Sequence, residues 1–240
     1  MKSIFSIVFL ITLSNAHFLA FLPNSDIISK QEDSTIKLNT MFIHPFEQTG
    51  MHMTKPKGIF LEDSTTSLAL KKTKKFNHQA WNSEYKIKRP GVYKFFVKPD
   101  LYFEEAEGKF ISHIPKVIIS AFGREDGWDE AIGLDFEIVP LVKPFGLYSG
   151  NLFQGKVLYK NKAMANIEVE VELYNEFGLK AASDVHITQV VKTDDNGIFS
   201  FVMNHKGWWG FAALIEKREK EFNSKKYPIE DGALIWIKAY

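Results

Sequence analysis

The chain has 240 residues, of which 45% are hydrophobic and 14% aromatic, so it can bury a substantial core. Its 30 lysine and arginine residues nearly balance 29 aspartate and glutamate residues, which argues against a nucleic-acid partner. Cysteine is absent, and this excludes disulfides, cysteine nucleophiles and thiolate metal sites. A bound metal must therefore be held by histidine, methionine, carboxylate or backbone groups, or by a terminal amine.

Residues 1–16 have the pattern of a secretory signal peptide. Lys2 precedes an apolar stretch of about ten residues, and a small or polar run ends at Ala16. Cleavage after Ala16 would place His17 at the N-terminus of a periplasmic protein. No second apolar run approaches the about 20 residues of a membrane-spanning helix. We therefore expect the mature protein not to be embedded in a membrane.

Strand-like segments fill the first part of the chain, with no long amphipathic helix between them. The predicted strands are residues 17–22, 35–43, 58–61, 83–88, 92–97, 110–122 and 134–139. The basic run at residues 71–75 is interpreted as a solvated turn. Prolines and glycines interrupt the strands between Pro140 and Asn151, which predicts a domain boundary there.

The second part of the chain repeats this pattern. The predicted strands are residues 152–159, 167–174, 185–192, 198–202, 208–216 and 233–239. Apolar residues alternate with three glutamates in Ile167–Tyr174, which predicts one buried face and one solvated acidic face. The turn Thr193–Gly197 favours a tight hairpin because Asn and Gly tolerate positive φ. The charged segment Lys217–Lys226 is interpreted as a loop or short helix.

These patterns predict an all-β protein built from two β-sandwich domains. The expected divisions are a signal peptide at residues 1–16, a metal-binding N-terminal β-sandwich at residues 17–143 and a C-terminal β-sandwich at residues 144–240. The order of strand, Asn-Gly turn and Phe-rich strand in the second half resembles a transthyretin-like or carboxypeptidase-regulatory-like module.

The candidate metal ligands that the composition favours are histidines. An N-terminal His17 would combine a free α-amine with an imidazole, and together they close a compact chelate on a late transition metal. His44 ends a predicted strand next to a proline, where it can face a pocket. His113 falls within a predicted strand beside apolar residues, and a buried imidazole needs a partner. We predict a divalent transition-metal site held by His17, His44 and His113, with Glu47, His52 or Glu104 contributing.

Sequence signatures of catalysis are missing. The chain contains no Gly-x-Ser-x-Gly element, no His-Glu-x-x-His zinc motif, no P-loop and no dinucleotide fingerprint. We therefore expect a binding protein rather than an enzyme.

An ordered set of segments resembles the exported proteins of the DUF4198 family, a domain of unknown function associated with nickel and cobalt uptake. The segments are His17, residues 44–47, 50–56, 90–93, 102–113, 122–130, 144–151 and 207–214. The resemblance implies a periplasmic protein that binds Ni²⁺ or Co²⁺ and supplies it to an inner-membrane permease.

Two other functions remain open at this stage. One is a copper site of the histidine-brace type, in which a terminal histidine and a second imidazole hold Cu²⁺. The other is a metal-free adhesion or scaffold β-sandwich. Ligand chemistry alone does not separate nickel from copper, because Cu²⁺ binds nitrogen sites more tightly than its neighbours. Metal binding should weaken below about pH 6.5, where an ordinary histidine becomes protonated.

Overall fold

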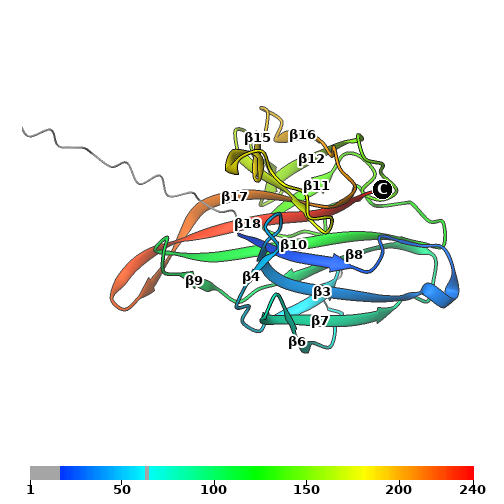
Figure 1. Ribbon diagram of the computed structural model, residues 1–240, viewed down its shortest axis with the longest axis horizontal. Helices are drawn as coiled ribbons and strands as arrows, with labels where there is room; N and C mark the ends of the chain where they lie inside the picture. Colours follow the sequence, from blue (N-terminus) through cyan, green and yellow to red (C-terminus); the bar gives the residue numbers. More distant parts are fainter. Residues whose placement is uncertain (1–16, 63–64) are drawn as a thin grey trace, which may run out of the picture.

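The computed structural model describes residues 17–62 and 65–240, so the predicted signal peptide and its cleavage site lie outside the described residues. In this part of the chain the helical segments are two single 3₁₀ turns, η1 (Gln31–Asp33) and η2 (Asp184–His186). No helix among these residues is long and apolar enough to cross a membrane. The strands form three sheets stacked in layers, with the largest in the middle (Figure 1). The predicted all-β fold is therefore confirmed.

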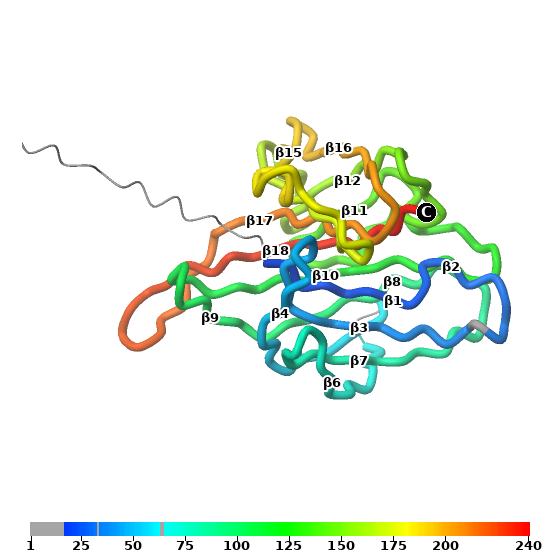
Figure 2. Tube along the Cα trace, in the orientation of Figure 1, coloured from blue at the N-terminus to red at the C-terminus, as the bar shows by residue number. Residues whose placement is uncertain are grey.

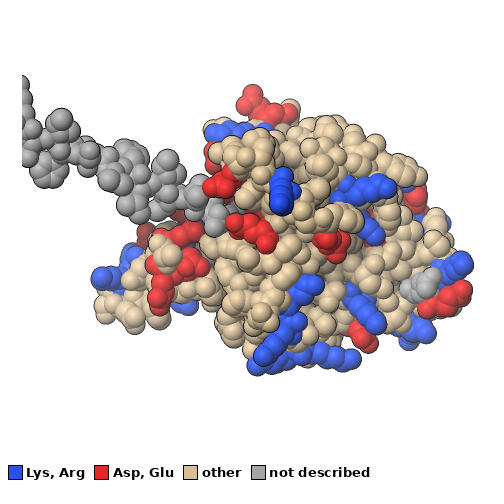
Figure 3. Space-filling view, viewed as in Figure 1, with Lys and Arg blue, Asp and Glu red and all other residues tan. Residues whose placement is uncertain are grey.

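The outer layer formed by the first part of the chain is sheet A. Its strand order is β1-β3-β7-β6, and β4 extends it by pairing with the end of β3. The strands are β1 (Phe18–Pro23), β3 (Thr35–His44), β4 (Thr49–Met51), β6 (Lys71–Lys75) and β7 (His78–Lys86). The lysines of β6 lie on an exposed edge strand, so the predicted solvated turn at residues 71–75 is wrong. Charged edge strands of this kind resist pairing with other chains. Blue lysine side chains accordingly gather along the lower edge of the molecule (Figure 3).

The middle layer, sheet B, joins both parts of the chain. Its order is β15-β14-β17-β18-β10-β8-β5, with β2 and β9 also paired to β10. The strands are β2 (Ile27–Ile28), β5 (Gly58–Leu61), β8 (Gly91–Lys98), β9 (Tyr102–Glu104), β10 (Lys109–Ala121), β14 (Glu168–Tyr174), β15 (Gln189–Lys192), β17 (Gly207–Phe222) and β18 (Lys225–Ala239). The connection between the two halves is the parallel pairing of β10 with β18.

The third layer, sheet C, covers the other face of the middle sheet. It consists of β11 (Phe136–Pro140), β12 (Leu152–Tyr159), β13 (Lys162–Ala163) and β16 (Ile198–Val202). The central strand β12 pairs with the other three.

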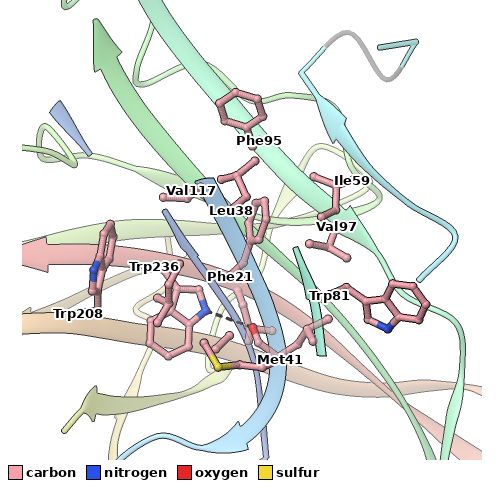
Figure 4. Packing of buried hydrophobic residues seen from close by; sticks show 14 of the residues in the cluster. Phe21, Leu38, Met41, Ile59, Trp81, Phe95, Val97, Val117, Trp208 and Trp236 are labelled. Atoms are coloured by element: carbon pink, nitrogen blue, oxygen red, sulfur yellow. Dashed lines mark hydrogen bonds between the residues drawn. The ribbon is translucent and has the colours of Figure 1, made fainter. Parts of the chain in front are cut away.

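Two hydrophobic cores lie on opposite faces of sheet B, because side chains alternate between the faces of a strand. On β18, Leu234 and Trp236 face the core shared with sheet A, whereas Ile235 and Ile237 face the core shared with sheet C. The indole nitrogen of Trp236 donates a hydrogen bond of 3.2 Å to the carbonyl oxygen of Leu19, within the aromatic packing of Figure 4. The two predicted β-sandwiches are thus present, and they share one central sheet. The division at residues 143 and 144 stays a prediction.

Three local expectations differ from the structure. The segment 217–226 is neither loop nor helix, because β17 and β18 continue through it and turn at Asn223 and Ser224, both with positive φ. This long hairpin projects beyond the body of the molecule (Figure 2). The turn Thr193–Gly197 was expected to close a hairpin. It connects two different sheets instead, since β15 pairs with β14 and β16 pairs with β12. Only residues 189–192 of the predicted strand 185–192 are extended.

Candidate metal centre

The antiparallel register of β1 and β3 brings two of the predicted ligands together. Phe18 lies opposite Ile43, so the residue before β1 meets the last residue of β3. These residues are His17 and His44, and their ring centroids are 4.7 Å apart with an angle of 47° between the ring planes. Two imidazoles at this distance can supply nitrogen ligands to one ion, and imidazole suits nickel, cobalt and copper.

Burial around this pair favours the neutral imidazole. The side chains of His17 and His44 are only 15% and 16% exposed. Burial, followed by the neighbouring His44, lowers the pKa of His17, while Glu107 and Glu104 act in the opposite direction. A neutral imidazole is the form that binds metal, so this environment keeps His17 available to an ion at lower pH than an exposed histidine.

Carboxylates surround the histidine pair. The Nδ1 atom of His17 is 3.5 Å from Oε1 of Glu107, and Nδ1 of His44 is 4.0 Å from Oε2 of Glu47. Glu104 ends β9 nearby, where it accepts a hydrogen bond from the backbone N–H of Ala106. The predicted contributors Glu47 and Glu104 therefore lie near the pair. Glu107 was missed, although it belongs to the same acidic run as Glu104.

His113 lies apart from this pair. Its side chain is 2% exposed, and the ring of Phe42 contacts both histidines, with its centroid 6.4 Å from that of His113 and 5.8 Å from that of His17. His113 also contributes electrostatically to the lowered pKa of His17. The Nε2 atom of His113 is 2.9 Å from Oε1 of Glu230. Burial opposes ionisation of Glu230, but hydrogen bonding to His113 and pairing with Lys109 lower its pKa to about 2.

His52 accompanies His113 rather than His17. It is exposed in the segment after β4, and together with His113 and Phe42 it lines a cavity of about 30 Å³. In the parts of the chain that the structure describes, no three histidine, aspartate or glutamate side chains are grouped so as to hold one metal ion. The six predicted residues thus divide into a His17–His44 pair with acidic neighbours and a separate His113–His52 cavity.

Lys109 pairs with one carboxylate beside each histidine site, Glu107 beside His17 and Glu230 beside His113. Its ammonium group is 2.7 Å from Glu107, and it also forms a close ion pair with Glu230. Burial would lower the pKa of Lys109, yet hydrogen bonds to the two carboxylates outweigh this effect and raise it. Sequence reasoning missed Lys109 and Glu230, because Glu230 comes from the far end of the chain.

A close packing contact positions the ring of His113. Gly232 lies opposite His113 in the parallel β10–β18 ladder, and a Cβ atom at this glycine would lie within 3.0 Å of Nε2. We expect Gly232→Ala to displace the ring and to lower the free energy of unfolding by about 1–3 kcal/mol, the usual cost of overpacking. Urea denaturation measures the loss. Gly91→Ala is the control, since its nearest neighbour would be 3.4 Å away, and equal stability of both variants would contradict the expectation.

A buried glutamate of the middle sheet holds the loop after His44. Glu172 accepts hydrogen bonds from the backbone N–H of Phe46, at 3.3 Å, and from the hydroxyl of Thr188. It was expected on a solvated face, but it is 1% exposed, because sheet B is covered on both faces. Burial, the largest influence, raises its pKa from 4.5 to about 7.

The raised pKa predicts a pH-dependent stability. The folded protein binds the proton of Glu172 more tightly than the unfolded chain, so this group adds stability as the pH falls from about 7 to 4.5. Glu172→Gln should therefore stabilise the protein at pH 8 by up to about 3 kcal/mol, because a tenfold change in proton affinity corresponds to about 1.4 kcal/mol. Urea denaturation of both proteins between pH 5 and pH 8 tests this. Parallel curves would contradict it.

The fold and site define a β-sandwich protein in which the pairing of β1 with β3 brings two imidazoles together among carboxylates. The model of the DUF4198 family, described as a domain of unknown function, matches residues 14–217. The chain belongs to this family. Among curated protein sequences nothing matches.

Solved structures give distant likenesses. The D0-D1 domain of intimin is 12% identical and has a TM-score of 0.26, over 92% of this chain and 99% of that one. The Yersinia pseudotuberculosis adhesin InvE is 10% identical and has a TM-score of 0.25, over 89% of this chain and 58% of that one. A putative membrane-anchored protein from Corynebacterium diphtheriae is 11% identical and has a TM-score of 0.25, over 92% of this chain and 58% of that one. At these TM-scores the likeness supports no functional inference.

Proposed function

We propose that this is an exported carrier that binds Ni²⁺ or Co²⁺ through His17 and His44 and supplies the ion to a permease of the inner membrane. The observation that supports it is the 4.7 Å approach of the two imidazole rings at the start of the first strand. Cleavage after Ala16 would add the α-amine of His17 as a third nitrogen ligand. Glu107 and Glu47 lie beside the two Nδ1 atoms and favour a cation electrostatically.

The accessibility of the pair suits a carrier. A carrier must release its cargo, so its site should stay open on one side, unlike the closed coordination of a structural metal. The two side chains keep 15% and 16% of their surface exposed. The resemblance to exported proteins of nickel and cobalt uptake supports the choice of metal.

A specific observation favours copper as a second candidate. In the described chain the cluster offers two imidazoles but no third side chain of the His, Asp or Glu type that completes a metal site. A terminal amine with two imidazoles is the donor set of a histidine brace. Such a protein would carry Cu²⁺ instead.

Calorimetric titration of untagged protein that begins at His17 tests the binding. We expect one tight site, and we expect an added residue before His17 to weaken it strongly, since that residue converts the amine into an amide. Titrations with Ni²⁺, Co²⁺ and Cu²⁺ compare the metals. Equal affinity of the extended and mature chains would contradict the role of the amine, and absence of binding would favour a metal-free scaffold.

The transport role is tested in cells. A strain that lacks the gene, grown under nickel limitation, should accumulate less nickel and show lower nickel-enzyme activity than its parent. Unchanged uptake of both nickel and cobalt would contradict transport. N-terminal sequencing of the exported protein establishes whether it begins at His17.

A further inference from the structure

The second nitrogen of His113 has no hydrogen-bond partner among the residues that the structure describes. Its Nε2 is hydrogen-bonded to Glu230, which also forms an ion pair with Lys109. A carboxylate paired with a lysine accepts hydrogen bonds, so Nε2 is the donor in this contact and Nδ1 is the ring nitrogen left to act as a ligand. This Nδ1 is buried and makes no hydrogen bond within the described structure. A carboxylate on one ring nitrogen and no hydrogen-bond partner on the other is the arrangement that a metal-binding histidine needs.

The cavity that His113 lines is also lined by a methionine. Met53 and His52 line the cavity together with His113. With a volume of about 30 Å³, it has room for a single ion or water. His52 is exposed, and so is Asp100, which also lines the cavity, so both lie on its solvent side.

The backbone of Met53 is held in place by strand β7. Its N–H donates to the carbonyl oxygen of Gln79 at 3.2 Å, and its carbonyl accepts from Nε2 of Gln79 at 2.8 Å and from Nε1 of Trp81 at 3.4 Å. The side chain of Met53 is 6% exposed. These three hydrogen bonds hold the backbone of Met53 beside β7, and Met53 lines the cavity.

We propose that this cavity is a second metal site, which takes a soft monovalent ion of the Cu⁺ class. Its ligands are Nδ1 of His113 and the thioether of Met53, with His52 closing it from the solvent side. A thioether ligand favours Cu⁺ over the harder divalent ions, and imidazole also binds copper. The site uses neither His17 nor His44, so it stands independently of the proposed nickel or cobalt site.

The test uses the chain beginning at His17 with His17→Ala and His44→Ala, which removes the first pair of imidazoles. Under anaerobic, reducing conditions, Cu⁺ is titrated in competition with a chromophoric chelator. We expect one Cu⁺ per chain, and Met53→Leu should weaken binding by more than about tenfold. Leucine preserves the volume of methionine at a small cost in stability, and Met51→Leu is the matched control that should leave affinity unchanged.

A second measurement covers the case in which a variant folds poorly. In otherwise unsubstituted protein with labelled methionine methyl groups, addition of Ag⁺ should shift the Met53 resonance in the NMR spectrum and leave that of Met41 in place. Ni²⁺ affinity should be the same with and without Met53→Leu. An unmoved Met53 resonance, an unchanged Cu⁺ affinity of the Met53→Leu variant or an effect of this variant on Ni²⁺ binding would each overturn the proposal.

Discussion

Replacement of His44 by alanine is expected to lower the affinity for Ni²⁺ by at least about 100-fold. In the proposed site His44 supplies one of two imidazoles, and its ring lies 4.7 Å from that of His17. Loss of a direct ligand should exceed the 10- to 100-fold loss typical of outer-shell partners. Calorimetric titration of protein that begins at His17 measures the effect.

Two other histidines provide controls. His186 and His205 are exposed in the second half of the chain, so alanine at either position should leave Ni²⁺ affinity unchanged. Because burial lowers the pKa of His17, affinity should fall only below the ordinary histidine pKa of about 6.5. Equal affinities of the His44 and His186 variants would contradict the assignment.

Removal of Glu137 is expected to cost about 3–5 kcal/mol of stability, the usual effect of leaving one buried charge without its partner. Glu137 forms an ion pair with Lys116, and both side chains are 1% exposed. Burial lowers the pKa of Lys116, an effect that Glu137 opposes. Glu137 also accepts backbone hydrogen bonds of 3.0 Å and 3.2 Å from Ile132 and Gly133. Its loss therefore affects both the lysine and the loop before β11.

Urea denaturation of Glu137→Ala measures this cost. The double variant Lys116→Met with Glu137→Leu should recover much of the stability, because it removes both charges and keeps the volume. Glu125→Ala is the matched control, since Glu125 forms an exposed pair with Lys143 at 3.0 Å and should contribute less than about 1 kcal/mol. A similar small loss for both glutamates would contradict the importance of the buried pair.

The sequence predicted most strands directly, because a run of apolar residues or an alternation of apolar and polar residues depends on local sequence alone. Leu152–Tyr159 and Ile198–Val202 have the bounds expected from their residues. The end of β17 and the start of β18 were not recognised, since charged residues on a projecting hairpin lack the apolar alternation that a buried strand shows.

The sequence alone did not predict which distant strands pair with one another. The pattern of Glu168–Tyr174 predicts an alternating strand, but only the sheets packed on both of its faces explain why Glu172 is buried. The Asn-Gly turn before Ile198 is local and was recognised, whereas its role as a link between two sheets depends on partners far along the chain.

For the candidate site, the sequence alone determined the ligand chemistry: an all-β chain without cysteine, with His17 after a predicted cleavage site and His44 at a strand end. Only the tertiary structure decided which ligands meet. The β1–β3 register brings His17 to His44, while Phe42 contacts both His17 and His113. The parallel β10–β18 pairing brings Glu230 to His113. The physical reason is that residue type sets what a side chain can bind, whereas long-range strand register sets which side chains share a face.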